Sequence, residues 1–372
     1  MKNFSRGNLY VKNFLLLTSV CLALASCQKT ADIKSSTAQP NISESQTPGN
    51  FALNNYFEVV LNANRGGYNA FHTNARLHNA WGLAASPTGI FWVNGADAGL
   101  SFVLDSLGNT IIPAVAVPSH IPNVQGNPTG IVFNGTQDFW VPGTGKQAFF
   151  IFASEDGTLS GWNGGSTAIV VADKSDKDAS YKGLAIAQNN GDNFLYATNF
   201  TKQKIDVFDK NFKHVNSSAF KDPNMPAHFA PFGIRNINNM LYVTYARQTA
   251  DGEDDSAHAG FGYVDVFWPN GTLAKRFASR GTLNSPWGIS PSTPALTGKS
   301  AVLIGNFGDG RINVYDWDGN YQGQLQQGGR AVKIDGLWAI DNTVANTSPK
   351  QLYFTAGPND EADGIFGFLT KY

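Results

Sequence analysis

The sequence predicts an all-β protein, a six-bladed β-propeller with four-stranded antiparallel blades. Two observations support this fold. A glycine followed by a branched aliphatic residue recurs six times at intervals of about fifty residues, which is the length of one propeller blade. Short aromatic-rich segments, separated by turn sequences, follow each recurrence. The six glycines are Gly82, Gly130, Gly183, Gly233, Gly288 and Gly336.

Each unit contains segments for four strands, and the glycine lies in the first. The second strand is expected at 90–95, 138–143, 194–200, 240–246, 301–307 and 351–357. The third is expected at 101–105, 149–154, 204–209, 263–268, 311–316 and 364–369. Most third strands end in a tight turn such as DSLGN, SEDGT, WPNGT or DWDGN, which leads into a fourth strand such as 111–118 or 166–172. The glycine lets backbones approach closely where the innermost strands crowd at the axis.

The two ends of the repeat region predict how the ring closes. The sixth unit stops after its third strand, at Tyr372, whereas the segment 56–64 (YFEVVLNAN) belongs to no unit. If 56–64 supplies the fourth strand of the last blade, the ring closes and no sheet edge stays open. In a linear array of units, the third strand of the sixth unit would lack a neighbour and the segment 56–64 would have no sheet to join. We therefore expect one propeller domain over residues 51–372.

The N-terminus has the features of an export signal. Three basic residues precede an apolar run over 14–25 that is too short to span a bilayer comfortably. The sequence LASC that follows resembles the lipobox of bacterial lipoproteins, which implies cleavage before Cys27 and a diacylglycerol on its thiol. An ordinary cleavage site beside an incidental cysteine is the alternative. We expect a signal peptide over 1–26 and, over 27–50, the lipidated cysteine and a solvated tether rich in Ser, Thr, Gln and Pro.

Composition limits the partners of the mature chain. The other cysteine, Cys21, lies inside the signal, so the mature domain has no disulfide and no thiol chemistry. Loss of Lys2, Arg6 and Lys12 with the signal changes the balance of 27 Lys+Arg against 28 Asp+Glu to 24 against 28. Because no basic excess attracts phosphate backbones, nucleic acid is not an expected partner. We expect a monomer that the lipid anchor alone holds at the bacterial cell envelope, on the outer membrane, with the domain in the periplasm or facing the medium.

The repeat also resembles known propellers. The turn and strand sequences NFGDGRINVYD (306–316) and NFTKQKIDVFD (199–209) are similar to those of NHL-type propellers. The strings PWG, PTGIVFNG, YKGLA, GNFGDGRIN and DGLWA resemble the markers of an uncharacterised family of secreted bacterial propellers. The match covers nearly all of the chain after the tether. It implies the six-bladed fold and no particular activity.

The antiparallel order divides the loops between two faces. Loops joining second to third strands, and connections between blades, share one face, here called the loop face; the other turns form the turn face. Segments of the turn face, such as SPTG and NINN, satisfy only turn geometry. The loop face carries longer polar segments and five of the six histidines: His72, His78, His120, His228 and His258. We therefore expect the functional site on the loop face, at the mouth of the central channel.

Oxygen-bearing side chains near the axis suggest a divalent cation. Asn199 and Asn306 end second strands and Asp335 begins a blade, and such ligands suit Ca²⁺, the candidate cofactor, or another divalent ion. The IDGLWA sequence resembles the Pro-Asp-Gly stretch of six-bladed lactonases of the senescence-marker and paraoxonase type, which hold a divalent ion with Glu, Asn and Asp. The other blades do not complete such a cage, since they have Trp81, Thr129, Lys182, Phe232 and Trp287 where blade six has Asp335.

Two charged pairs have alternative interpretations. Lys182 opens blade three, opposite the blade of Asp335. We favour an ion pair between them across the channel, and the alternative is a catalytic or ligating role for these residues. Asp309 and Arg311, in the turn of GNFGDGRINVYD, either pair with each other or contact a ligand.

The segment 250–260 (ADGEDDSAHAG) is the longest loop-face insertion between strands. Its carboxylates do not have the alternating spacing of an EF-hand, so we expect a solvated, mobile acidic loop that could cover the mouth. His258 on this loop could act as a general base if a substrate lay within hydrogen-bond reach.

Aromatic and polar residues complete the ligand-binding candidates. Trp81, Trp287 and Trp338 could form a stacking platform for sugars, but we favour packing between blades. Tyr245 and Arg247, at the end of a second strand, are further candidates.

Two functional hypotheses follow. The chain contains no Gly-x-Ser-x-Gly elbow, P-loop or His-Glu-x-x-His motif. We favour a module that binds a small-molecule or protein ligand through its loop face. The alternative is a divalent-metal-dependent lactonase, hydrolase or lyase at the channel mouth.

Overall fold

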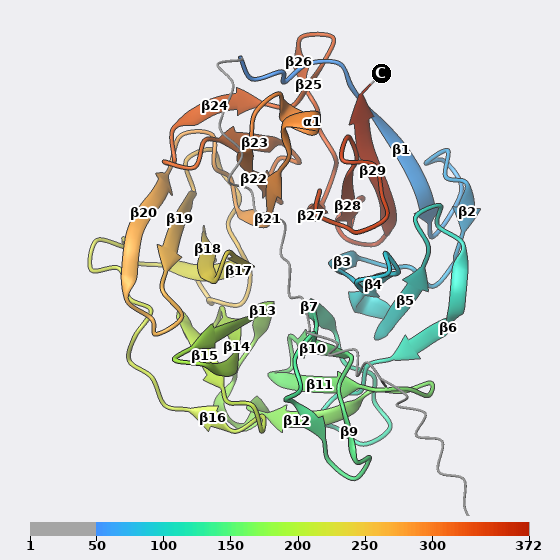
Figure 1. Ribbon diagram of the computed structural model, residues 1–372, viewed down its shortest axis with the longest axis vertical. Helices are drawn as coiled ribbons and strands as arrows, with labels where there is room; N and C mark the ends of the chain where they lie inside the picture. Colours follow the sequence, from blue (N-terminus) through green and yellow to red (C-terminus); the bar gives the residue numbers. More distant parts are fainter. Residues whose placement is uncertain (1–49, 372) are drawn as a thin grey trace, which may run out of the picture. The chain divides into compact units, whose positions relative to one another are not determined.

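Six β-sheets surround a central axis in the computed structural model, which describes residues 50–371. Figure 1 shows the ring along its axis, with β3, β7, β13, β17, β21 and β27 innermost. The predicted six-bladed propeller is therefore confirmed. The predicted signal peptide, Cys27 and the predicted tether up to residue 49 lie outside the described residues. Within residues 50–371, no helix is long and apolar enough to cross a membrane.

Five blades are built from strands that follow one another along the chain. Blade one consists of β3 (Ala80–Ala85), β4 (Phe91–Gly95), β5 (Leu100–Leu104) and β6 (Thr110–Ala116). Blade two consists of β7 (Pro128–Phe133), β10 (Phe150–Ser154), β11 (Thr158–Trp162) and β12 (Ile169–Asp173). Blade three consists of β13 (Tyr181–Asn189), β14 (Asp192–Asn199), β15 (Lys204–Phe208) and β16 (His214–Val215). Blade four consists of β17 (Phe229–Ile237), β18 (Met240–Arg247), β19 (Gly262–Phe267) and β20 (Leu273–Ser279). Blade five consists of β21 (Pro286–Ser292), β22 (Ala301–Asn306), β23 (Ile312–Tyr315) and β24 (Tyr321–Gln324).

The last blade combines both ends of the described chain. Three of its strands are β27 (Leu337–Asp341), β28 (Leu352–Ala356) and β29 (Ile365–Lys371), and the fourth is β1 (Tyr56–Ala63). β1 pairs antiparallel with β29, with Val59 opposite Phe368, and the two-residue β2 (His72–Thr73) extends the sheet. The predicted closure by the N-terminal strand is confirmed. It leaves the third strand of the last blade paired on both sides.

Blade two differs from the prediction. The segment 138–143 is not its second strand; it contributes β8 (Trp140–Val141) to a hairpin with β9 (Lys146–Gln147), inserted between β7 and β10. Phe139 has a φ of +64°, a left-handed conformation that ends an extended strand, and Trp140 is 54% exposed. The segment 149–154 therefore supplies the second strand. As a result, SEDGT joins β10 to β11 and lies on the loop face.

Glycines form a close seam between neighbouring innermost strands. A Cβ on Gly82 would lie 2.0 Å from the carbonyl oxygen of Thr129, and one on Gly233 would lie 2.1 Å from that of Trp287. No side chain fits at such distances, so the repeated glycine permits adjacent blades to touch through their backbones.

In blade six the seam position is Ala339, and the predicted alignment of Gly336 with the other glycines is wrong. A Cβ on Gly288 would meet the carbonyl oxygen of Trp338, at 2.6 Å, which places Trp338 where the other blades have the residue before the glycine. Gly336 lies in the preceding turn with a φ of +63°. Asp335 is therefore not the equivalent of Trp81 and Lys182.

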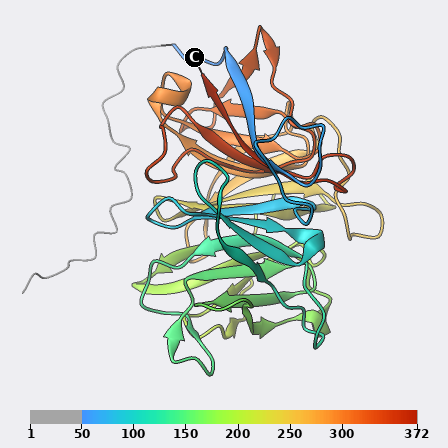
Figure 2. The same ribbon diagram turned by 90° about the vertical axis from the view of Figure 1, so that its right-hand side faces the viewer.

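Shorter elements lie in the connections. They are the 3-10 turns η1 (Ala96–Ala98) and η2 (Ser175–Lys177), the helix α1 (Pro294–Thr297) and the hairpin of β25 (Gln326–Gln327) and β26 (Arg330–Ala331). α1 joins β21 to β22 and so marks the turn face, on the left of Figure 2, whereas η1 marks the loop face on the right. The described chain begins at the turn face, where the Ala52 N–H donates to the carbonyl of Thr297 at 2.8 Å.

Candidate functional site

Aromatic rings close the channel toward the loop face. Trp338 stacks on Trp81 with ring centroids 3.6 Å apart and on Phe307 at 3.9 Å. Phe232 and Trp287 contact Trp338 edge-on at 5.8 and 5.9 Å. We call these five rings, with Phe200 beside Phe232, the aromatic plug. Trp81 and Trp338 are 2% and 1% exposed, so their rings pack between blades.

Lys182 lies on the plug. Its side chain is 5% exposed, and its Nζ lies 5.3 Å from the ring centroid of Trp81. The ammonium forms an ion pair with Glu155, and Asp254 Oδ1 is 3.9 Å away. Among the described residues, no ion pair joins Lys182 to Asp335, so the favoured prediction of that pair is wrong. The changed strand order of blade two is the reason, because it brings SEDGT and Glu155 to the loop face.

Carboxylates from four blades surround Lys182. Each lies in the loop between the second and third strands of its blade, and we call the group the acidic mouth: Asp97, Glu155, Asp254, Asp255 and Glu361. Charge interactions connect them, since Glu155 raises the pKa of both Asp97 and Glu361. Four of the five carboxylates interact with the charge of Lys182, and Asp97 joins the group through Glu155.

Glu361 is the most perturbed carboxylate of the mouth. Burial, opposed by a hydrogen bond from Asn79 and supported by the charge of Glu155, raises its pKa to about 7. The Asn79 amide donates to Glu361 Oε2 at 2.6 Å, and its oxygen accepts from the indole N–H of Trp338 at 2.8 Å. Asn79 thus fixes the position of Glu361 against the aromatic plug.

The backbone around Glu361 is strained. Asn359, Asp360 and Glu361 have consecutive φ values of 60°, 50° and 65°. Asn and Asp adopt this left-handed conformation more readily than Glu does. Strained backbone persists where the surrounding structure enforces it, and it is frequent at functional sites. Here it turns the loop of blade six toward the mouth.

The other charges at the mouth are also shifted. Burial alone would lower the pKa of Lys182, but the attraction of Glu155, Asp254 and Glu361 raises it. Burial raises the pKa of Asp97 and of Asp255. The Oδ2 atom of Asp255 is buried without a hydrogen-bond partner in the described part of the chain. The mouth thus keeps Lys182 charged, and the pKa is raised for three of its carboxyl groups, those of Asp97, Asp255 and Glu361.

The acidic loop 250–260 is folded against this site. The Thr249 N–H donates to the carbonyl of Asp254 at 2.8 Å, and Gln248 forms a β-bridge with Asp255. The prediction of a loop surrounded by solvent is wrong for Asp255, which is half-buried, whereas Asp251, Glu253 and Asp254 are exposed. His258 is exposed, and its Nδ1 lies 2.8 Å from the carbonyl of neighbouring Ala259.

The predicted metal ligands are occupied within the protein. Asn199 donates to Asp206 at 2.8 Å, and its Oδ1 accepts from Thr201 Oγ1 at 3.2 Å. Asn306 donates to the carbonyl of Thr282, while its Oδ1 accepts from Asn313 at 3.2 Å.

Asp335, the third predicted ligand, accepts from the Asn359 N–H at 3.1 Å. Over residues 50–371, no group of three or more His, Cys, Asp or Glu side chains is arranged to hold a metal ion. The donor set of Asn199, Asn306 and Asp335 therefore does not fit a shared cation.

The remaining candidates are dispersed. Arg311 lies 3.8 Å from Asp309, whose Oδ1 also accepts from Asn306 Nδ2 at 2.9 Å. Tyr245 is buried in the core between blades three and four. The guanidinium of Arg247 lies 4.6 Å from the ring centroid of Phe261 and is exposed. Trp287 in the plug donates its indole N–H to the carbonyl of Lys182 at 3.1 Å.

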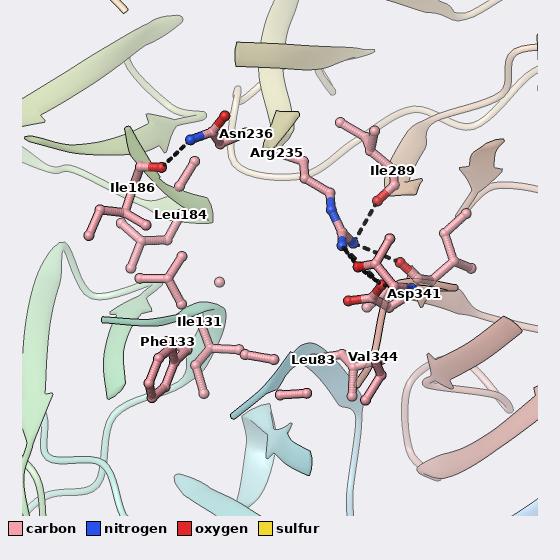
Figure 3. A pocket seen from close by; sticks show the side chains of 18 of the residues that line it. Leu83, Ile131, Phe133, Leu184, Ile186, Arg235, Asn236, Ile289, Asp341 and Val344 are labelled. Carbon is pink, nitrogen blue, oxygen red and sulfur yellow. Dashed lines mark hydrogen bonds and ion pairs between the residues drawn. The ribbon is translucent and has the colours of Figure 1, made fainter. Parts of the chain in front are cut away.

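A cavity of about 420 Å³ occupies the other end of the channel, toward the turn face. Its wall is a ring of aliphatic side chains, each following a seam position: Leu83, Ile131, Leu184, Ile234, Ile289 and Ile340. Figure 3 shows Arg235 reaching across to Asp341, 2.9 Å from Nη2 to Oδ1. From the sequence we expected only turns at this face, and the cavity was not predicted.

Comparison with known proteins identifies relatives. The uncharacterised protein R648 of Acanthamoeba polyphaga mimivirus is 34% identical over 317 residues, which cover 81% of this chain and 77% of that protein. Protein L690 of the same virus, also uncharacterised, is 33% identical over 324 residues, covering 81% and 82%. The chain belongs to the family of these mimivirus proteins. No model of a known protein family matches the sequence.

Solved structures similar to this family member share its fold. A streptogramin B lyase structure aligns with a TM-score of 0.52 at 14% identity, over 86% of this chain and 98% of that chain. A Bacteroides thetaiotaomicron protein of unknown function aligns with a TM-score of 0.52 at 11% identity, over 85% and 76%. At such identities the likeness concerns the fold alone. Because the relatives are viral, the bacterial origin implied by the sequence resemblance stays a prediction.

Three residues of the mouth escaped the sequence analysis. Glu155 was hidden by the wrong strand order in blade two. Glu361 lies in GPNDEADG, a loop-face segment in which no residue was singled out. Asn79 precedes the first strand of blade one and has no motif of its own. The shared signal is position, because five units have an acid in the loop between their second and third strands, and four of these loops contribute to the mouth.

Proposed function

We propose that this chain is a binding module that recognises a positively charged group at the acidic mouth. The observation that carries the proposal is the surplus of acid around one buried lysine, since four carboxylates from three blades interact with the charge of Lys182 and Asp97 from a fourth blade interacts with Glu155. Such an excess attracts cations and raises their local concentration. Glu155 and Asp254 are 29% and 80% exposed, so a cation arriving from solvent can reach them. The ligand is an organic ammonium or guanidinium group, on a small molecule or on a protein partner.

The second candidate is an enzyme of the lactonase, hydrolase or lyase class. Glu361 favours it, because a carboxyl group with a pKa of about 7 exchanges protons readily near neutral pH. The metal-dependent version receives no support from Asn199, Asn306 and Asp335, whose donor atoms bond locally. Turnover of a panel of lactones that Glu361→Gln abolishes would favour this candidate over a binding module.

We also propose that Cys27 is lipidated and that the domain is held at a bacterial cell envelope, on the outer membrane. The LASC sequence and the tether composition support this location. Incorporation of labelled palmitate into the full chain, lost in Cys27→Ser, tests it. An unlabelled wild-type chain would contradict it.

Calorimetry with a pair of probes tests the binding function. Butylamine and butan-1-ol have the same hydrocarbon chain, and only the amine is charged at pH 7.5. We expect butylamine to bind and butan-1-ol not to bind at the same concentrations. Glu361→Gln and Asp254→Asn should each weaken butylamine binding about tenfold, because a hydrogen bond to a charged group contributes about 1.5–3 kcal/mol.

Asp318→Asn is the matched control. Asp318 is exposed in the turn between β23 and β24 on the turn face, so its loss removes the same charge away from the mouth. Equal affinity for the amine and the alcohol would refute the proposal. Preferential binding of butyrate would also refute it, and would identify Lys182 as an anion receptor instead.

A further inference from the structure

We propose that the cavity at the turn face is a second binding site, for an uncharged amphiphile with one hydrocarbon chain. This site is separate from the acidic mouth and does not depend on it. The aromatic plug lies between them, and Trp287 belongs to both the plug and the cavity wall. A ligand in the cavity therefore cannot reach Lys182.

The lining of the cavity favours a hydrocarbon chain. All six blades contribute an aliphatic side chain at the level just past the seam, and Phe133, Ile186 and Val344 extend the apolar wall. Figure 3 shows these side chains around a common hollow. The volume of about 420 Å³ lies within the range of about 300–1,000 Å³ typical of small-molecule sites. Ligand sites in proteins combine apolar walls with placed polar groups, and this cavity has both, because Arg235, Asn236 and Asp341 lie beside the aliphatic ring.

The charges of the cavity exclude a charged head group. Its two charged lining residues, Arg235 and Asp341, pair with each other. Arg235 also donates to the carbonyls of Ile289 and Ile340, at 3.1 and 3.2 Å, and Asp341 accepts from Thr343 N–H and Oγ1 at 2.7 Å. A second charge would enter without an unpaired charge to meet it, at a high desolvation cost, because the unused polar atom of the lining, Asn236 Oδ1, is uncharged. A hydroxyl or ester group needs only a hydrogen bond.

An apolar groove continues the cavity outward between blades one and two. The groove and the cavity share Ser86 and Phe133. Beyond Phe133 the groove is lined by Trp92 and Trp162, with Phe149 49% exposed. A linear chain can therefore begin in the cavity and continue along the groove, whereas a compact ring compound would leave the groove empty. This continuity is the reason for assigning a single extended chain.

A series of primary alcohols tests the proposal. Hexan-1-ol, octan-1-ol and decan-1-ol are titrated into the domain of residues 50–371, and binding is measured by calorimetry. Tryptophan fluorescence gives a second signal, because Trp287 lines the cavity. Each two added carbons should tighten binding by about fifteenfold while apolar wall is available. Decanoate should bind at least tenfold more weakly than decan-1-ol, and decylammonium should do so in the Glu361→Gln variant, in which the acidic mouth binds amines less well.

Two variants at one position locate the ligand. Leu184→Phe fills the cavity and should weaken decan-1-ol binding at least tenfold, whereas Leu184→Ala enlarges it and should favour longer alcohols. Ile169→Phe is the control, since Ile169 is 39% exposed on the outer strand β12, away from the channel. If Leu184→Phe does not fold, the chain-length shift in Leu184→Ala decides alone.

Three results would overturn the proposal. Affinity that does not change from hexan-1-ol to decan-1-ol would show that no apolar cavity is filled. Unchanged binding to folded Leu184→Phe would place the ligand elsewhere. Decylammonium that binds Glu361→Gln as tightly as decan-1-ol does would show that the cavity accepts a charged head group. Retention of butylamine binding in the Leu184 variants confirms that the domain and its loop face are intact.

Discussion

The two ends of the channel are made from adjacent positions of the same repeated strand and differ in chemistry. The residue before each seam position, such as Trp81 or Trp338, contributes to the plug, and the residue after it, such as Leu83 or Ile340, lines the cavity. These two positions are two residues apart, so their side chains point to the same side of the strand, and one repeat generates both layers at successive heights along the axis. The loop face differs again because its connecting loops, and not the repeated strand, supply the carboxylates.

The comparison shows how charged side chains are accommodated near the axis of this propeller. Lys182 is the one charged residue among the six plug-level positions, and Glu155 from the next blade compensates it. At the turn face Arg235 is compensated in the same way by Asp341. Both ends therefore contain one buried cation with a carboxylate partner. The two ends differ in the number of carboxylates, because only the loop face has acidic side chains beyond the one that pairs with its cation.

Replacing Glu155 with Gln should have the largest effect. It leaves the Lys182 ammonium, 5% exposed, without its hydrogen-bonded counter-charge, and should lower the free energy of unfolding by about 3 kcal/mol. The double variant Lys182→Met/Glu155→Gln should lose less, since no unpaired charge stays buried. Urea unfolding measures both.

The control for this prediction is Asp254→Asn. Asp254 is 80% exposed and 3.9 Å from Lys182, so its loss should change the free energy of unfolding by less than about 1 kcal/mol. A double variant less stable than Glu155→Gln would show that the pair, and not the unpaired lysine, determines stability at this end.

Glu361→Gln should reverse the pH dependence of stability at the mouth. The folded pKa of about 7 lies above the ordinary value of 4.5, so the folded state binds the proton more tightly and stability falls as pH rises from about 4.5 to about 7. The variant should not show this decrease in the free energy of unfolding, which amounts to at most about 3 kcal/mol in the wild type. Wild type and variant should be equally stable near pH 4.5, with the variant more stable at pH 8.

The same titration separates binding from stability. Butylamine should bind more tightly as Glu361 ionises between about pH 6 and pH 8, and Glu361→Gln should show a flatter profile. A wild-type profile that is flat across this range would contradict the assignment of Glu361 to the cation site.

The fold was predictable from sequence because its signals are local and repeated. The glycine with its following aliphatic residue recurs in five blades, and the orphan strand 56–64 accounted for closure. Blade two was misread because two aromatic segments lie close together, and only tertiary pairing distinguishes 138–143 from 149–154. Asp335 was misplaced because blade six has alanine at the seam.

The site was less predictable because it depends on contacts between blades. Lys182 and the loop face were identified, but its partner depends on the register of blade two. Asn79 donates a hydrogen bond to Glu361 in the strained loop of blade six, and these two residues are 282 positions apart in the sequence. No local pattern encodes such a contact. The cavity escaped because aliphatic residues at the axis look like ordinary core.

Arg235→Met should destabilise the turn face moderately. It removes hydrogen bonds to the carbonyls of Ile289 and Ile340, but Asp341 keeps both of its bonds from Thr343. We expect a loss of about 1–2 kcal/mol in urea unfolding, smaller than for Glu155→Gln, because no charge is left without hydrogen bonds. Butylamine affinity should not change, since the plug separates the two ends. A coupled loss of amine binding would show that the ends communicate.

The smallest effect is expected at the turn between β22 and β23, where Asp309 and Arg311 could pair. Arg311 is 49% exposed and its Nη1 lies 3.8 Å from Asp309, so Arg311→Ala should cost less than about 0.5 kcal/mol. Asp309→Ala should cost about 1 kcal/mol, because Asp309 Oδ1 accepts from Asn306 Nδ2 at 2.9 Å and from the Arg311 N–H at 3.2 Å. Equal losses in urea unfolding would mean that the ion pair matters more than the turn. A larger loss for Asp309→Ala would assign this carboxylate to turn formation, as in the repeated turns of the other blades, and would leave ligand recognition on the loop face to the acidic mouth.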